Sequence, residues 1–242
     1  MKNICLNYHN LGFYPQVGIN KVHPQIFKNH IEIINNYIKN NPGITIDITF
    51  DDAYEDVYKH SFEVLNGSLV NDKIIFPISD YIGKLNQWDF TFMVNRYRHL
   101  DKDKIKEMSS RGWLVGSHSK THQSLEIMNS KDALSELKES KDCIEQMIDK
   151  DVECFSPPFG VIGQRIYDLC AKVGYKKIYV QKNKVIESLE GVKIIERHNI
   201  YSIDRNRNIL MKLAENSLES RKESFISSFN NLTVFFKKII PK

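Results

Sequence analysis

The chain has 242 residues, 41% of them hydrophobic and 26% charged, a composition typical of a folded protein with one substantial core. Its 34 basic and 30 acidic residues give a net charge of +4, a mild and dispersed excess that does not point to a nucleic-acid partner. No apolar stretch reaches the roughly 20 residues that a membrane-spanning helix needs, and the N-terminus turns polar too early for a signal peptide, so we expect a cytoplasmic protein.

Strand-like and helix-like stretches alternate along the chain. Short β-branched runs are typical of buried strands, and apolar residues three and four apart are typical of helices packed on a sheet. In chain order the patterns predict strands at 4–8, 44–50, 73–78, 113–117, 175–180 and 192–195, and helices at 24–39, before Gly67, between 101 and 112, at 130–150 and at 163–173. This order predicts an α/β fold, a parallel sheet with helices outside it, either open or closed into a barrel.

The predicted strand at 44–50 ends on two adjacent carboxylates, Asp51 and Asp52. Its isoleucines alternate with small polar residues, as expected for a strand whose second face lines a polar barrel interior. Catalytic groups of such barrels lie at the carboxyl ends of the strands. One carboxylate can therefore ligate a metal while the other stays free as a base. The alternative is that one of them caps the helix that begins near Glu55.

The predicted strand at 113–117 is followed by His118 and His122, the only histidines in the chain that are four residues apart. On a helical turn this spacing places two imidazoles on one face, which suits two ligands of one ion. A solvated loop with incidental histidines is the alternative. Because both motifs end strands, we favour a metal-assisted hydrolase site with one carboxylate, two imidazoles and a spare carboxylate.

Three further features are candidates for the same site. Residues 154–160 (Cys-Phe-Ser-Pro-Pro-Phe-Gly) contain two prolines, which predict a rigid turn that could aim a backbone N–H at a developing oxyanion, or an ordinary loop. His198 follows a predicted strand and could be a general acid, or equally a surface or core histidine. His9 also ends a strand and could line the pocket.

Taken in order, these segments resemble the polysaccharide deacetylase family, also called the NodB-homology domain or carbohydrate esterase family four. Residues 49–54 (Thr-Phe-Asp-Asp-Ala-Tyr) resemble its first motif, with Ala53 where glycine is usual. Residues 117–122 resemble the second motif, which contains the histidine pair, and residues 156–160 resemble the third. The resemblance spans roughly residues 4–200.

The resemblance implies a distorted (β/α) barrel of about seven units, with parallel strands inside and helices outside. It also implies a divalent metal, usually zinc. The roles that it implies are metal ligands for Asp52, His118 and His122, general base for Asp51, oxyanion donor through the backbone N–H for Phe159, and general acid for His198.

The sequence departs from the family pattern at several positions. Ser156 stands where many members carry an arginine that orients the base, and no clear counterpart of the fourth motif follows Gly174. Glu196 and Arg197 precede His198, where leucines are usual in the family. In some branches an arginine occupies about this place, so Arg197 is the alternative pocket residue to His198.

The resemblance predicts a hydrolase that removes the N-acetyl group of an amino sugar in a polysaccharide, lipopolysaccharide or capsule precursor and releases acetate. Without a visible export signal, we expect a nucleotide- or lipid-linked N-acetyl sugar or oligosaccharide as substrate. The alternatives are an impaired sugar-binding relative, a hydrolase of another amide or an O-acetyl ester, and a structural protein of the same fold.

We expect residues 1–242 to form a single catalytic domain with a helical tail from about residue 204. Residues 225–242 mix phenylalanine and isoleucine with lysine. This tail could contact a membrane surface peripherally, or form a helix docked on the barrel.

Overall fold

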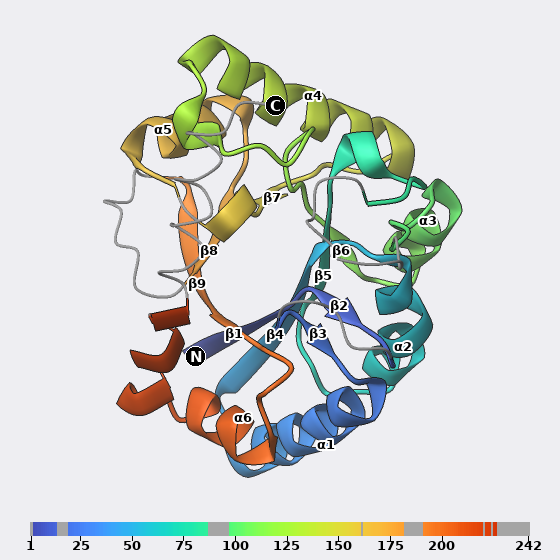
Figure 1. Ribbon diagram of the computed structural model, residues 1–242, viewed down its shortest axis with the longest axis vertical. Coiled ribbons are helices and arrows are strands. Elements are labelled where there is room, and N and C mark those ends of the chain that lie inside the picture. The colour runs from blue at the N-terminus through green and yellow to red at the C-terminus, as the bar shows by residue number, and fades with distance from the viewer. Residues whose placement is uncertain are drawn as a thin grey trace.

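The structure is a computed structural model that describes residues 2–13, 19–86, 97–160, 162–181, 191–219, 221–223 and 225–226. In these residues strands and helices alternate, as the sequence patterns predict (Figure 1). The strands are β1 (Lys2–Tyr8), β2 (Asn10–Leu11), β3 (Lys21–Val22), β4 (Ile44–Asp52), β5 (Lys73–Pro77), β6 (Leu114–Val115), β7 (Cys154–Phe155), β8 (Lys177–Gln181) and β9 (Lys193–Asn199). The α-helices are α1 (Pro24–Asn40), α2 (Glu55–Asn66), α3 (Lys102–Ser110), α4 (Ser130–Ile148), α5 (Gln164–Val173) and α6 (Asn206–Leu213).

Seven of the strands form one parallel sheet in the order β6-β5-β4-β1-β9-β8-β7. The two edges of this sheet meet just beyond β6, where Ser117 N donates to Cys154 O (2.9 Å) and Ser156 N donates to Ser117 O (2.9 Å). Figure 1 shows the strands around a common centre with the helices outside them. The distorted (β/α) barrel expected from the sequence is thereby confirmed.

The two faces of the sheet have different side chains because successive residues of a strand point to opposite sides. On β4, Ile46, Ile48 and Phe50 belong to the large apolar cluster under the helices. A second, smaller apolar cluster comes from four strands and fills the barrel interior; it contains Cys5, Ile74, Phe76, Cys154 and Tyr179. The polar residues of β4 therefore face the interior above this plug, as the alternation in the sequence predicts.

Three short strands were not predicted from the sequence patterns. Strands β2, β3 and β7 each contain two residues, too few to show a periodicity of two. Strand β9 is longer than predicted and continues through Asn199, whereas the sequence pattern ends it at Ile195. This extension decides which of its side chains reach the barrel interior.

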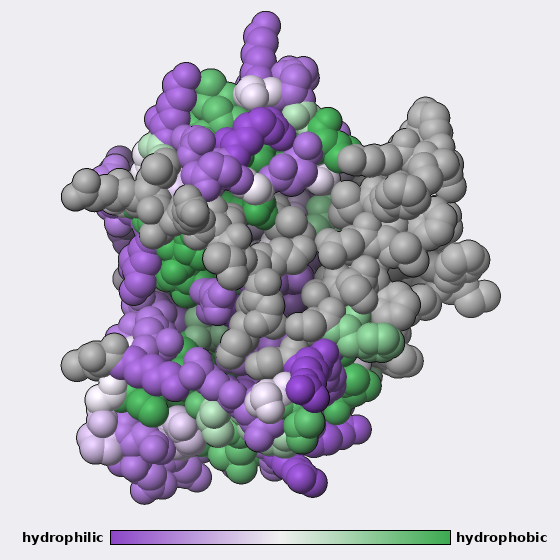
Figure 2. Space-filling view, turned by 90° about the vertical axis from the view of Figure 1, so that its left-hand side faces the viewer, coloured by the Kyte–Doolittle hydropathy of each residue, from purple (hydrophilic) through white to green (hydrophobic). Residues whose placement is uncertain are grey.

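The outer surface has both hydrophilic and hydrophobic residues. On the face that contains α5 and α6, hydrophilic residues surround smaller groups of hydrophobic ones (Figure 2). Across the part of the chain that the structure describes, no helix combines the length and the apolar character needed to cross a membrane. Of the tail predicted from about residue 204, residues 227–242 lie outside the described residues.

Candidate active site

Three side chains expected as metal ligands come together at the carboxyl ends of the strands. Asp52 ends β4, and His118 and His122 follow β6. One ligand atom from each lies within 4.8 Å of the others, with Asp52 Oδ1 at 3.6 Å from His118 Nε2 and 3.5 Å from His122 Nε2. One carboxylate and two imidazoles in this arrangement fit a divalent cation such as zinc.

His118 is prepared to act as a ligand. Its Nδ1 lies 2.7 Å from the carbonyl oxygen of Ser156 and must donate to it, which leaves Nε2 with a lone pair directed at Asp52. Burial lowers the pKa of His118, although the nearby Asp51 carboxylate opposes this, so the ring is neutral at neutral pH. A neutral imidazole with a fixed tautomer is the form that binds metals.

The backbone around the site is held in the left-handed region. Positive φ angles occur at Asp52 (65°), Ala53 (50°), Ser119 (65°), His122 (59°) and Phe159 (64°). Such conformations cost energy for residues with a Cβ and gather where the surrounding structure enforces them. Ala53 occupies the place where glycine is usual in the family that the sequence resembles, and its φ explains that usage. Neither Asp51 nor Asp52 caps α2, whose N-cap is Tyr54, so the capping alternative is wrong.

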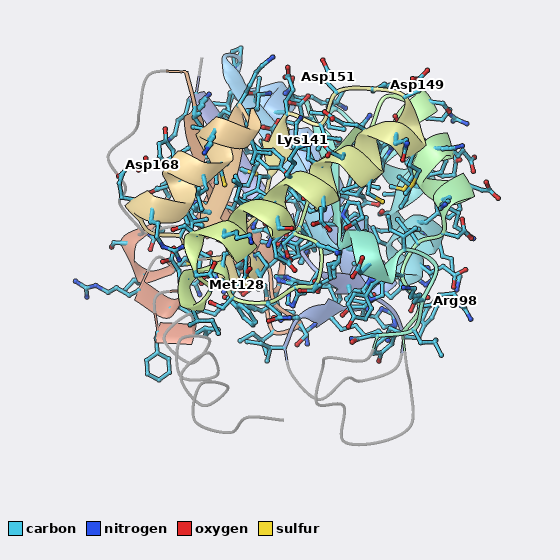
Figure 3. The ribbon with its side chains drawn as sticks, turned by 90° about the horizontal axis from the view of Figure 1, so that it is seen from above. Arg98, Met128, Lys141, Asp149, Asp151 and Asp168 are labelled. Carbon is cyan, nitrogen blue, oxygen red and sulfur yellow. The ribbon has the colours of Figure 1, made fainter. Side chains whose placement is uncertain are left out.

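Helix α4 supports the turn that carries the two histidines. The carboxylate of Glu136 accepts hydrogen bonds from the backbone N–H groups of Lys120 (3.1 Å) and Thr121 (2.9 Å), and the hydroxyl of Ser140 donates to Ser119 O (3.0 Å). Figure 3 shows α4 lying along the outside of the barrel, from the loop near Met128 to Asp149. Sequence reasoning missed Glu136, and the only available signal was an acidic residue on the inward face of an amphipathic helix.

Asp51, the expected base, forms a bidentate ion pair with a buried arginine. Arg197 is 1% exposed and donates through Nη1 to Asp51 Oδ1 (2.8 Å) and through Nη2 to Oδ2 (2.9 Å). Burial by itself would raise the pKa of Asp51, but the Arg197 guanidinium, together with His118 and His9, outweighs burial and holds this pKa well below its usual range. Arg197 Nη2 also donates to Ser156 Oγ (2.8 Å), so the arginine reaches the position at which the sequence lacks one.

A layer of polar side chains surrounds this pair. Asn7 Nδ2 donates to Asp51 Oδ2 (3.1 Å), while Asn7 Oδ1 accepts from Thr49 Oγ1 (2.7 Å) and Arg197 Nη1 (2.9 Å). Asn7 is in register with Thr49 on β4 and with Asn199 on β9, three neighbouring strands of Figure 1. These residues were not identified from the sequence, because their proximity depends on strand register.

The structure does not bring His198 to Asp51. Arg197 and His198 are adjacent on β9, so an inward Arg197 requires an outward His198. His198 Nδ1 instead lies 3.0 Å from Glu223 Oε2, in a buried group of charges that also contains Lys212. The expected general acid is therefore on the wrong face of the strand for this site.

Two other expected residues do lie at the site. His9 Nε2 is 3.9 Å from Asp51 Oδ2, and its side chain is 22% exposed. Burial lowers the pKa of His9 to about 4, against the opposing effect of Asp51. The ring of Phe159 packs 5.2 Å from that of His122, so the turn after β7 reaches the proposed metal ligands.

Comparisons with known proteins identify the family and the fold of the chain. The sequence model of the polysaccharide deacetylase family matches residues 38–178. Bacillus subtilis YxkH, which carries the family's name, is 28% identical over 129 residues, or 53% of this chain and 42% of that protein. The chain thus spans less than half the length of the curated relatives that it matches.

Solved structures resemble the fold. Streptococcus pyogenes deacetylase PplD, in complex with acetate, aligns with a TM-score of 0.68 at 18% identity, covering 88% of this chain and 98% of that one. IcaB from Ammonifex degensii aligns with a TM-score of 0.67 at 16% identity, covering 82% and 91%. At these identities the likeness concerns the fold alone.

Proposed function

Because the chain belongs to the polysaccharide deacetylase family, we propose that it is a metal-dependent deacetylase that hydrolyses the N-acetyl group of an amino sugar and releases acetate. The proposed substrate is a nucleotide- or lipid-linked N-acetyl sugar or oligosaccharide, a precursor of a polysaccharide, lipopolysaccharide or capsule. One observation carries the proposal. An ionised carboxylate, Asp51, lies directly beside three side chains that suit a divalent cation.

In this proposal Asp52, His118 and His122 hold the ion, which we propose is zinc. A divalent cation there would activate water and polarise the acetamide carbonyl. Asp51 takes the proton of the attacking water, and Arg197 keeps that carboxylate deprotonated and oriented toward it.

The turn after β7 and the end of β1 supply the remaining proposed groups. The backbone N–H of Phe159 donates to the oxyanion of the tetrahedral intermediate. His9 is neutral at neutral pH, so it must acquire a proton during the reaction before it can protonate the leaving amine. Asp51, whose Oδ2 lies 3.9 Å from His9 Nε2, receives the proton of the attacking water and passes it to His9. His9 then donates this proton to the leaving amine.

Arg197 also weakens the reading of this chain as an impaired sugar-binding relative. That reading depended on the serine at 156, where many members of the family have an arginine. The guanidinium of Arg197 contacts both Asp51 and Ser156, so the base keeps an arginine partner delivered from β9.

The proposal is tested by metal analysis and acetate release on the purified protein and on His118→Ala. We expect about one equivalent of a divalent cation in the wild type, strongly reduced in the variant, together with acetate release from N-acetylated sugars. A wild type that stays without metal after reconstitution at neutral pH would refute metal dependence. Release of acetate from O-acetyl esters but not from amides would replace the proposed substrate class.

A further inference from the structure

Beside the proposed site, strands β2 and β3 form a short parallel ribbon with two faces. Asn10 pairs with Lys21, and Leu11 pairs with Val22. Leu11 and Val22 belong to the main apolar core, so the alternation of side chains places Asn10 and Lys21 on the other face. The second face of this ribbon therefore has a polar and a cationic side chain next to each other.

Lys21 on that face is buried without an acidic partner. It is only 7% exposed, and Nζ donates to Tyr97 Oη (3.2 Å) and lies 4.3 Å from the centre of the Tyr97 ring. Within the described ranges, no ion pair joins Lys21 to a carboxylate, and the nearby Asp56 pairs with Lys59. Buried lysines are normally paired, because an uncompensated charge is expensive to remove from water.

Two residues next to Lys21, Gly12 and Asn10, make this position suitable for binding an anion. A Cβ on Gly12 would lie 2.3 Å from Lys21 Cε and 2.7 Å from Nζ, so glycine at 12 leaves the space that the lysine side chain fills. The amide Nδ2 of Asn10 is buried and has no hydrogen-bond partner among the described residues, although its Oδ1 accepts from Leu11 N. Within the described residues, the Lys21 ammonium thus donates to a neutral hydroxyl and the Asn10 amide N–H to no acceptor, so this donor pair has no anionic partner.

A series of packed rings connects this position to the proposed active site. The ring of Tyr97 is 6.0 Å from that of Tyr54, and the ring of Tyr54 is 4.7 Å from that of His99. His99 Nδ1 donates to the backbone carbonyl of Asp52 (2.7 Å). On the other side, Asn10 directly follows His9, which faces Asp51. The donor pair is thus linked to the backbone of Asp52 through the rings of Tyr97, Tyr54 and His99, and to Asp51 through the adjacent residue His9.

We propose that Lys21 and Asn10, with the hydroxyl of Tyr97, bind a phosphoryl group of the substrate. This inference rests on the proposed function and narrows its substrate to a phosphorylated N-acetyl sugar, with the phosphate or diphosphate at the donor pair and the acetamide at the metal ligands. A nucleotide-linked and a lipid-linked sugar share this phosphoryl chemistry. A neutral polymer would leave the lysine buried and uncompensated.

The test compares Lys21→Met with Lys28→Met, an exposed lysine on α1 that serves as the matched control. Acetate release is measured with an N-acetylhexosamine 1-phosphate and with the neutral methyl glycoside of the same sugar. We expect the ratio of kcat/KM for the phosphorylated over the neutral sugar to fall at least about tenfold in Lys21→Met and to stay constant in Lys28→Met. A constant ratio in both variants would overturn the proposal.

A binding measurement separates this proposal from the activity itself. Pyrophosphate should raise the thermal unfolding temperature of the wild type and of Lys28→Met, and should not raise that of Lys21→Met. This result would stand even if no substrate released acetate, which would refute the proposed function alone. If Lys21→Met fails to fold, Asn10→Ala provides the second variant, in which the same loss of pyrophosphate stabilisation is expected. Equal stabilisation of all variants would refute the site.

The source of the phosphoryl group is resolved by two further substrates, a nucleoside diphosphate N-acetyl sugar and a short-chain polyprenyl diphosphate N-acetyl sugar. Faster turnover of one identifies the activated precursor, and each should depend on Lys21. Turnover of both without dependence on Lys21 would contradict the assignment of the phosphoryl site.

Discussion

Asp51 combines a strongly stabilised negative charge with a position next to the three proposed metal ligands. Arg197 is the main reason that this buried carboxylate is ionised, because burial alone would favour the protonated form. The same bidentate contact fixes the orientation of both carboxylate oxygens. Because the carboxylate is already charged and oriented, no further conformational entropy is lost in orienting it when the substrate binds.

Replacing Asp51 with asparagine should remove the proton acceptor and keep the shape of the side chain. We expect kcat to fall by about 100- to 10,000-fold, the usual range for losing a general base, with metal content retained. Asp47→Asn is the matched control, since Asp47 lies on the same face of β4 but bonds to Asn3 and Asn71 away from the site. Activity that survives in Asp51→Asn would rule out its role as base.

The two histidines at the ends of β1 and β9 should differ in their effect on turnover. His9 faces Asp51, whereas His198 contacts Glu223 on the outer face of the sheet. We expect His9→Ala to lower kcat by about 100-fold or more and His198→Ala to lower stability while retaining most of kcat. Parallel measurement of kcat and of urea unfolding distinguishes these effects. The reverse pattern would restore His198 as the acid.

At the scale of elements, side chains of helix α4 form hydrogen bonds with the turn that carries the two histidines. The turn between the two proposed histidine ligands contains two residues with positive φ, Ser119 and His122. Two of its backbone N–H groups, those of Lys120 and Thr121, donate to the carboxylate of Glu136 rather than to a neighbouring strand. The geometry of the histidine pair is therefore set by a helix that lies later in the chain.

Glu136→Gln should weaken metal binding without unfolding the protein. Both N–H groups donate to the same carboxylate oxygen of Glu136, while the other oxygen accepts from Thr121 Oγ1 (2.8 Å). The uncharged amide of glutamine is a weaker acceptor for the N–H groups and cannot accept from Thr121 Oγ1 through its nitrogen, so the turn loses part of its support. We expect metal affinity to fall by about 10- to 100-fold, as for other residues that support metal ligands. Glu139→Gln, one turn away and exposed, is the control and should bind metal as the wild type does. Equal affinities, measured by competition with a chelator, would contradict the supporting role of Glu136.

What the sequence reveals about this site depends on whether the contacts are local. Asp51, Asp52, His118 and His122 were identified from the sequence because each pair lies within one short segment at a strand end. The choice between Arg197 and His198 depends on the register and length of β9, and a shift of one residue exchanges the two faces. Glu136 and Asn7 act across 15 or more residues, so no local spacing marks them.

At the scale of the whole molecule, closure of the barrel is what assembles the site. The sequence predicts a parallel sheet but leaves it open or closed, because closure depends on one long-range join, between Ser117 and Phe155. This join places the Ser156 carbonyl against His118 and the Ser156 hydroxyl against Arg197. Ser156, next to the join, thus contacts both one proposed metal ligand, His118, and the arginine that holds the proposed base.

The stability of the whole barrel should decrease in acid because it buries neutral histidines. His30 on α1 is fully buried, and its Nδ1 lies 3.2 Å from the hydroxyl of Tyr8 on β1. Burial lowers the pKa of His30 to about 4, from 6.5 in the unfolded chain. Below pH 6.5, His30 therefore becomes protonated in the unfolded chain but stays neutral in the folded protein. The free energy of unfolding decreases progressively until about pH 4.

For His30 this shift corresponds to about 3 kcal/mol of unfolding free energy lost between those pH values. His9 and His99, whose pKa values burial also lowers to about 4, should add to the same slope. Urea unfolding at a series of pH values, with a chelator present so that metal release does not contribute, measures the total. His30→Gln should flatten the curve by the His30 share, and an unchanged slope would show that His30 becomes protonated without unfolding.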